Sequence, residues 1–224
     1  MNEGFDKAKG KYVALFDHDD VMTPKRLQIQ YDYMESHPDI AACGGSMKEF
    51  GVSSNLLMSV PGYEEIILEM LARKRRYICN PCGFLRKEVI DRYSLRYKRG
   101  YSFNADIKYW SDVLQIGKVV NLPEVLIWYR TSDKQTSRVT RIESQKAAEV
   151  IFQEHAEFFI SRVMDADMRD KLENRLMPVL KKLADFSVFS NRRYFFFLYE
   201  LINGLYRNGF INLSEPLYES KIKS

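Results

Sequence analysis

Three aspartates follow a short apolar run near the start of the sequence. The run, residues 12–16, shows no alternation of polar and apolar side chains, which predicts a strand buried on both faces, as in a parallel sheet. Asp17, Asp19 and Asp20 come directly after it, and open α/β sheets place their ligand sites where strands end. Carboxylates this close repel one another unless a positive charge lies nearby. Asp17 and Asp19 therefore predict a site for Mg²⁺ or Mn²⁺, which bind carboxylate oxygens and often bridge to substrate phosphates.

A polar turn between a strand and a helix is the alternative interpretation, because Asp is common in turns. Three aspartates in four positions directly after an apolar run favour the metal site over a simple turn. His18 would point away from its neighbours if the strand continued, so we do not expect it to bind the metal. We expect it to be structural or to contact the residues that bind the metal.

The composition is that of a soluble globular protein. Of the 224 residues, 46% are hydrophobic and 29% are charged, which excludes a disordered chain, and the net charge of +4 is too small to indicate nucleic-acid binding. The sequence shows no signal peptide and no apolar run long enough to span a bilayer, so we expect a cytoplasmic protein. Cys43, Cys79 and Cys82 form an odd set that is typical of reduced thiols. No second pair supports zinc binding by Cys79-x-x-Cys82, so structural thiols are favoured.

The sequence predicts two regions. Residues 1–137 alternate short apolar runs with helical patterns, which indicates an α/β domain, and residues 138–224 indicate a helical appendage. Thr23-Pro24 predicts a helix start, and Leu27, Tyr31 and Met34 then recur at helical spacing. Further helices are predicted over residues 63–73, 87–93 and 105–116, and strands over residues 40–43, 83–86, 119–120 and 125–129. An aromatic and basic stretch, residues 192–207, is expected to pack within the appendage, with an interfacial helix at the membrane surface as the alternative.

The segment NEGFDKAKGKYVALFDHDDVMTPKRLQIQ resembles the middle of a family 2 glycosyltransferase with the GT-A fold. Those enzymes read R-N-x-G, A-x-G-x-Y, an apolar strand ending in D-x-D-D, and then P-x-R-L-x-x-Q. The matching residues are Asn2, Gly4, Ala8, Gly10, Tyr12, Asp17, Asp19, Asp20, Pro24, Arg26, Leu27 and Gln30. Asn80-Pro81 with Phe84, Arg86 and Lys87 resembles the acceptor-side segment, and residues 121–126 with Tyr129, Arg130, Gln135 and Ser137 resemble the end of the catalytic domain.

The resemblance implies a partial GT-A sheet and an inverting, metal-dependent transfer of a sugar. The donor would be a nucleotide-sugar and the acceptor a hydroxyl of a glycan, polysaccharide or lipid-linked sugar. Asp17 and Asp19 would hold the cation, which neutralises the leaving nucleoside diphosphate, and Asp106 would be the catalytic base. Donor contacts are implied for Asn2, Gly4, Asp17, Asp20 and Arg130. Without the resemblance, Asp106 is better explained as an acid favoured at a helix N-terminus. Arg130 is then equally well explained as an exposed arginine at a strand end.

Two positions depart from the family pattern, since Ala105 and Ser132 stand where glutamate and histidine are usual. Family members also carry nucleoside-binding βα units upstream of R-N-x-G, so a chain that begins at Met1 is expected to lack base recognition. Such a chain would bind nucleoside diphosphates weakly, with Mn²⁺ and without base selectivity, and Asp19→Ala would abolish the binding.

Two other functions are compatible with the sequence. A truncated, catalytically incompetent remnant would act as a module that binds a partner or a glycan. A phosphatase similar to the haloacid dehalogenases would explain an apolar strand followed by D-x-D-x-x-T. That alternative is weaker, because Asp20 replaces the usual glycine and no later G-D-x-x-x-D segment follows.

Overall fold

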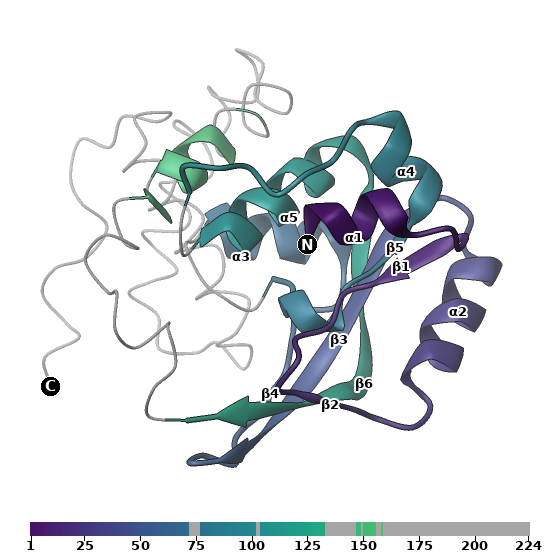
Figure 1. Ribbon diagram of the computed structural model, residues 1–224. Helices are drawn as coiled ribbons and strands as arrows, with labels where there is room; N and C mark the ends of the chain where they lie inside the picture. Colours follow the sequence, from purple (N-terminus) through teal and green to yellow (C-terminus); the bar gives the residue numbers. More distant parts are fainter. Residues whose placement is uncertain (72–76, 102–103, 133–146, 149, 156–157, 159–224) are drawn as a thin grey trace, which may run out of the picture. The chain divides into compact units, whose positions relative to one another are not determined.

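The structure, a computed structural model, describes residues 1–71, 77–101, 104–132, 147–148, 150–155 and 158 (Figure 1). The chain divides into two compact units, residues 1–70 with 74–152 and residues 71–73 with 153–224. The predicted appendage, residues 138–224, lies almost entirely outside the described residues, so it stays a prediction, as does its boundary at residue 137. The sheet and all predicted site residues belong to the first unit.

A six-stranded mixed sheet forms the centre of the first unit, which confirms the α/β class. The strand order is β1-β5-β3-β6-β2, with β4 beside β3. The two longest strands, β3 and β6, are parallel neighbours, and every other pair is antiparallel. The strands are β1 (Tyr12–Ala14), β2 (Val21–Met22), β3 (Ile40–Gly51), β4 (Leu56–Leu57), β5 (Phe84–Arg86) and β6 (Lys118–Thr131).

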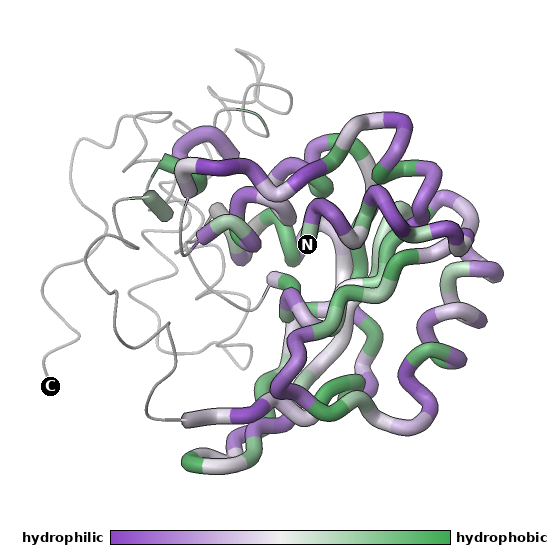
Figure 2. Tube along the Cα trace, viewed as in Figure 1, coloured by the Kyte–Doolittle hydropathy of each residue, from purple (hydrophilic) through white to green (hydrophobic). Residues whose placement is uncertain are grey.

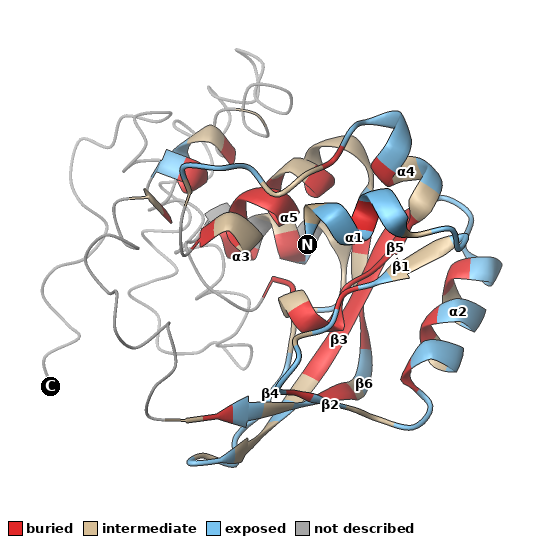
Figure 3. Ribbon diagram, viewed as in Figure 1, coloured by how far each residue is buried: buried red, intermediate tan, exposed pale blue. Residues whose placement is uncertain are grey.

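Helices cover both faces of this sheet. Helix α2 (Arg26–Ser36) lies on one side, and α1 (Asn2–Lys7), α3 (Tyr63–Leu71) and α5 (Ala105–Ile116) lie on the other (Figure 1). Met34 of α2 packs with Ile40, Cys43 and Phe84 of the sheet, and Trp110 of α5 is fully buried. Strand β5 and the first half of β3 are buried and largely apolar, whereas the outer surface of α2 is exposed (Figures 2 and 3). The described residues also form α4 (Lys87–Arg92) and the short 3₁₀ helix η1 (Asn80–Cys82).

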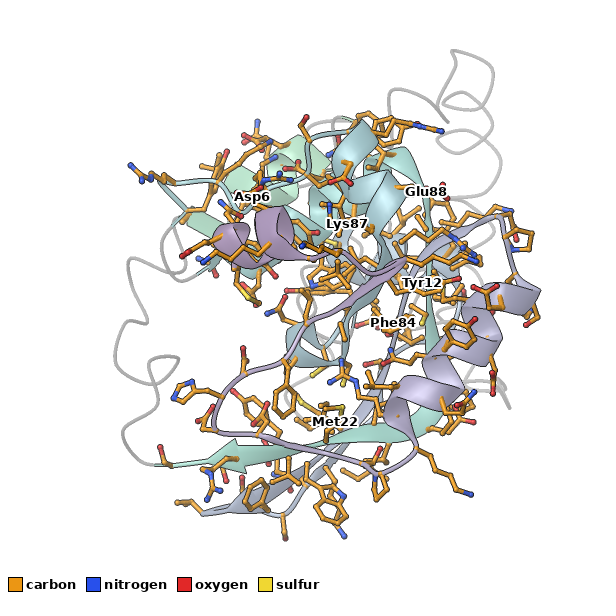
Figure 4. All side chains as sticks on the ribbon, turned by 45° about the vertical axis from the view of Figure 1, so that its right-hand side comes forward. Asp6, Tyr12, Met22, Phe84, Lys87 and Glu88 are labelled. Atoms are coloured by element: carbon orange, nitrogen blue, oxygen red, sulfur yellow. The ribbon has the colours of Figure 1, made fainter. Side chains whose placement is uncertain are left out.

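The first strand differs from its prediction. β1 ends at Ala14, lies at one end of the strand order and pairs antiparallel with β5, and none of its side chains is fully buried. The predicted parallel strand buried on both faces is therefore wrong. Tyr12 covers part of this edge by stacking on Phe84 with ring centroids 4.9 Å apart (Figure 4). An apolar run cannot distinguish a central strand from an edge strand that aromatic neighbours shield.

Helix α2 begins later than predicted, and its buried face is partly polar. The helix begins at Arg26 instead of Pro24, and it buries Arg26, Gln30 and Met34. Leu27 and Tyr31, which share helical spacing with Met34, are 47% and 45% exposed. The physical reason is that α2 faces backbone carbonyls at the ends of β1 and β5, and polar side chains satisfy them.

Later elements agree more closely with the sequence. Helix α5 has the predicted bounds, residues 105–116. The two short strands predicted between residues 119 and 129 form one continuous strand, β6. Its register with β3 skips Pro123 and Glu124 between the partners of Gly45 and Ser46. A bulge accommodates proline there, because proline has no N–H to give to the ladder.

Candidate active site

Residues 15–20, called the acidic loop below, connect the two edge strands of the sheet. β1 and β2 are at opposite ends of the strand order, so the loop runs from one edge of the sheet to the other. Leu15 N donates to Gly83 O at 2.8 Å, which extends the pairing of β1 with β5 by one residue. Asp20 N donates to Asp17 O at 3.3 Å, which closes a turn within the loop. These contacts fix the loop at its start and around its aspartates.

Asp20 is the buried aspartate of the acidic loop, with 8% of its surface exposed. Its Oδ1 accepts a hydrogen bond from Arg130 N at 2.9 Å, and its Oδ2 has no partner within the described part of the chain. Burial raises the pKa of Asp20 to about 6; the charges of Asp17 and Asp19 also raise it, and the Arg130 N–H opposes the shift. A buried, unpaired carboxylate oxygen is unfavourable, and a proton or a cation would relieve it.

Asp17 and Asp19 are more accessible. Asp17 is half-buried, and burial followed by the charge of Asp19 raises its pKa. Asp19 and His18 are exposed. Among the described residues, no group of three or more His, Cys, Asp or Glu side chains is arranged to hold a metal ion. A cation at these two aspartates would therefore need oxygens from the substrate, as Mg²⁺ commonly takes from phosphates.

A buried arginine holds the acidic loop against the sheet. Arg26 is fully buried, and its Nη2 donates to Leu15 O at 2.8 Å and to Gly83 O at 3.3 Å. Its Nε donates to Gln30 Oε1 at 2.9 Å, and Gln30 Nε2 donates to Cys82 O at 2.8 Å. The pair therefore ties the end of β1 to the segment before β5. Sequence analysis missed this role, although both residues belong to the P-x-R-L-x-x-Q match.

Strand β6 supplies two further residues to the loop. Arg130 Nε donates to Asp19 O at 2.8 Å, and its guanidinium lies 4.6 Å from the centre of the Phe50 ring. These contacts hold the loop to β6, and the predicted phosphate contact of Arg130 stays a prediction. Burial raises the pKa of Tyr129 to about 12, with further contributions from the loop aspartates, among which Asp20 acts most strongly. Tyr129 is a second residue that sequence analysis missed.

Asp106 lies in the first turn of α5, two residues after the buried Asn104 that precedes the helix. Burial, then the Tyr109 phenol and the charges of Asp106 and Asp17, raise the pKa of Tyr97. Both carboxylates therefore act on the same phenol. The role of Asp106 as catalytic base stays a prediction.

Asn2 and Gly4 have different surroundings. Asn2 Oδ1 accepts from Tyr97 N at 2.8 Å, and Asn2 Nδ2 donates to Tyr97 O at 2.9 Å. Asn2 therefore fixes the backbone of Tyr97. Gly4 is exposed on α1, and a Cβ there would meet nothing within 4 Å. The donor contacts predicted for both residues stay predictions.

The three cysteines are free thiols. Cys43 and Cys82 are buried, and burial raises the pKa of Cys43 to about 12. Cys79 Sγ donates to Met47 Sδ at 2.9 Å. These surroundings favour structural thiols, because a thiol must ionise to act as a nucleophile or metal ligand.

Comparisons with known proteins bear on the class of the protein. Residues 1–94 match the sequence model of the family described as "Glycosyl transferase family 2". An uncharacterized glycosyltransferase of Haemophilus influenzae is 26% identical over 172 residues, which cover 73% of this chain and 53% of that protein. The amylovoran biosynthesis glycosyltransferase AmsE of Erwinia amylovora is 26% identical over 140 residues, which cover 62% of this chain and 52% of that protein. The chain thus spans about half the length of these relatives.

The fold agrees with the sequence matches. The crystal structure of S. aureus TarS 1-349 in complex with UDP-GlcNAc superposes with a TM-score of 0.55 at 14% identity, covering 92% of this chain and 59% of that chain. The sheet therefore has the GT-A fold. The match of residues 1–94 to the family 2 model confirms, over that part of the chain, the resemblance found in the sequence. None of the helices in the described residues is long and apolar enough to cross a membrane.

Proposed function

We propose that this protein transfers a sugar from a nucleotide-sugar donor to a hydroxyl acceptor, with inversion at the anomeric carbon. One observation carries the proposal: residues 1–94, which contain the acidic loop with Asp17 and Asp19, match the sequence model of family 2 glycosyltransferases. An inverting transfer needs carboxylates beside the leaving group and a base beside the acceptor, because both serve one sugar.

The substrates are proposed by class from the relatives. TarS was crystallised with UDP-GlcNAc, so a nucleoside diphosphate sugar is the proposed donor. AmsE is named for amylovoran biosynthesis, so a hydroxyl of a growing polysaccharide is the proposed acceptor, with a lipid-linked glycan as a variant of the same chemistry.

Asp17 and Asp19 are proposed to hold Mg²⁺ or Mn²⁺ together with the donor diphosphate. Their carboxylate oxygens suit these cations, and the unpaired, buried Oδ2 of Asp20 indicates a loop with an excess of negative charge. When bound, the cation would supply charge neutralisation for the departing diphosphate. Asp20 holds the acidic loop to β6, because its Oδ1 accepts a hydrogen bond from Arg130 N.

Asp106 is proposed to accept the proton of the acceptor hydroxyl as that oxygen attacks the anomeric carbon. The C–O bond to the diphosphate breaks as the new glycosidic bond forms on the opposite face, which inverts the configuration. Asp106 lies in the first turn of α5, where the helix N-terminus favours negative charge. An ionised carboxylate can then act as the base.

The test is release of nucleoside diphosphate by the full chain, with UDP-GlcNAc, UDP-glucose and GDP-mannose as probes and methyl glycosides as acceptors. We expect release that requires Mn²⁺ or Mg²⁺, stops with EDTA and falls at least about 100-fold in Asp19→Asn and Asp106→Asn. Asp39→Asn, which neutralises an exposed aspartate paired with Lys118, is the matched control and should keep wild-type activity. Release of nucleoside diphosphate that does not depend on the cation and is not reduced in Asp106→Asn would refute the proposed chemistry. Tight binding of a nucleotide-sugar without release would favour a binding module.

A further inference from the structure

Asn80 lies at the junction of the elements that form the candidate site. It is the first residue of η1, and its carbonyl accepts a hydrogen bond from Gly83 N at 3.0 Å. Gly83 O in turn accepts from Leu15 N, the first residue of the acidic loop. Pro81 and Cys82 behind it are buried, whereas Asn80 itself is partly exposed. A polar side chain at this position can therefore be reached from solvent although its backbone is fixed.

Two donors determine which way the Asn80 amide points. Its Oδ1 accepts from Tyr97 Oη at 2.8 Å and from Trp110 Nε1 at 3.1 Å. Indole Nε1 can only donate, so the atom that faces Trp110 must be the carbonyl oxygen, and both of its lone pairs are used. The Nδ2 group then points away from both aromatic residues. It makes no hydrogen bond to any other residue that the structure describes.

The residues that hold Asn80 form a rigid aromatic group. Trp110 is fully buried. Tyr97 stacks on Tyr109 with ring centroids 4.4 Å apart, and Phe5 stacks on both tyrosines. Such packed aromatic rings have few alternative rotamers. The direction of the Asn80 amide is consequently set before any ligand binds, as a recognition group requires.

The amide lies among the residues proposed for the reaction. Trp110 and Asp106 are four residues apart on α5, so they share one face of that helix one turn apart. Tyr97, which binds Asn80 Oδ1, feels the charges of both Asp106 and Asp17. Both of the charges that act on Tyr97 are negative, which disfavours an anionic ligand at Nδ2. A neutral oxygen that accepts hydrogen bonds is the chemistry that fits.

We infer that Asn80 is a substrate-recognition residue whose Nδ2 donates a hydrogen bond to a hydroxyl oxygen of a sugar. The inference rests on the proposed function, and the sugar is either the one transferred or the acceptor. Tyr97 and Trp110 are positioning residues, because they act only by holding Oδ1. A fixed amide that reads one hydroxyl discriminates against epimers in which that hydroxyl points elsewhere, since the amide is then left unpaired.

The test compares wild type, Asn80→Ala and Asn80→Asp with UDP-GlcNAc, UDP-glucose and its C4 epimer UDP-galactose. We expect kcat/KM for the preferred donor to fall about tenfold in both variants, the typical effect of one lost hydrogen bond. The ratio of kcat/KM between UDP-glucose and UDP-galactose should move towards one. Binding of UDP with Mg²⁺ should stay within twofold in Asn80→Ala. Asn80→Asp keeps the oxygen that accepts from Tyr97 and Trp110 but lacks Nδ2. It therefore separates loss of the Nδ2 hydrogen bond from loss of packing. Asn55→Ala, which removes an exposed amide bound to Glu49, is the matched control and should change nothing.

The outcomes separate the two sugars and the two proposals. A loss seen in hydrolysis of the donor without acceptor assigns the contact to the transferred sugar, and a loss confined to transfer onto methyl glycosides assigns it to the acceptor. Unchanged kcat/KM and epimer preference in an active protein overturn the role of Asn80 alone. A loss of UDP binding as large as the loss of kcat/KM also overturns the role of Asn80, because the residue is then structural. A wild-type chain that releases nucleoside diphosphate from none of the probes overturns the proposed function and this inference together.

Discussion

Replacing Arg26 with methionine should strongly destabilise the first unit. Methionine has a similar length and is apolar, so it fills the space without forcing new contacts. It cannot donate to Leu15 O, Gly83 O or Gln30 Oε1, the three acceptors that Arg26 serves in a fully buried position. Because Leu15 begins the acidic loop, the same change should loosen the proposed metal-binding residues.

The magnitude follows from the acceptors that would lose a partner. Gly83 O keeps the bond from Leu15 N, so the main losses fall on Leu15 O and Gln30 Oε1. Each hydrogen bond from a charged donor contributes about 1.5–3 kcal/mol. Part of this is offset, because Arg26 Nη1 has no partner in the described part of the chain and burial lowers the pKa of the guanidinium. We expect a net decrease of about 2–4 kcal/mol in the free energy of unfolding.

Urea denaturation followed by tryptophan fluorescence measures this decrease. The sequence holds two tryptophans, Trp110 and Trp128, and both lie in the first unit, so the signal reports on that unit alone. Arg92→Met, the same chemical change at an exposed position at the end of α4, is the control and should alter stability by less than about 0.5 kcal/mol. If Arg26→Met is as stable as this control, the buried carbonyls have other partners and the reasoning is refuted.

Three further predictions concern Asp20, Gly83 and Asp106. In metal-free protein, Asp20→Asn should leave stability unchanged near about pH 4 and raise it by about 1–3 kcal/mol near about pH 8. Burial raises the pKa of Asp20 from 3.8 to about 6, so the folded state loses stability as the pH rises through this window. If urea titrations find the same stability difference between Asp20→Asn and wild type at both pH values, the burial of this charge is contradicted. Gly83→Ala should decrease the free energy of unfolding by about 1–3 kcal/mol, because a Cβ there would lie 2.6 Å from the Trp110 ring. Its control is Gly4→Ala, where a Cβ meets nothing within 4 Å. Equal melting temperatures for the two variants would contradict tight packing at Gly83. Asp106→Asn should lower the rate of sugar transfer by about 10²- to 10⁴-fold while UDP binding measured by calorimetry stays within twofold, and a full rate in this variant would place the base elsewhere.

Local patterns in the sequence were enough to predict several elements and the class of protein. Helix α5 has its predicted bounds, because apolar residues at helical spacing end at Gly117. The acidic loop follows an apolar strand as expected, and the ordered motifs around it resemble the family whose sequence model matches residues 1–94. These features depend on neighbours in the chain, so one sequence contains the information.

Contacts between distant segments decided the rest. The apolar run of β1 gave no sign that the strand is an antiparallel edge, since its partner, β5, lies some seventy residues later in the chain. Arg26 and Gln30 are polar residues whose burial depends on where the carbonyls of Leu15 and Cys82 lie. The direction of the Asn80 amide depends on two aromatic residues, 17 and 30 positions away. Sequence spacing determines helices, strands and motifs, whereas only the packed structure determines which buried polar atoms find partners and which remain free to bind a substrate.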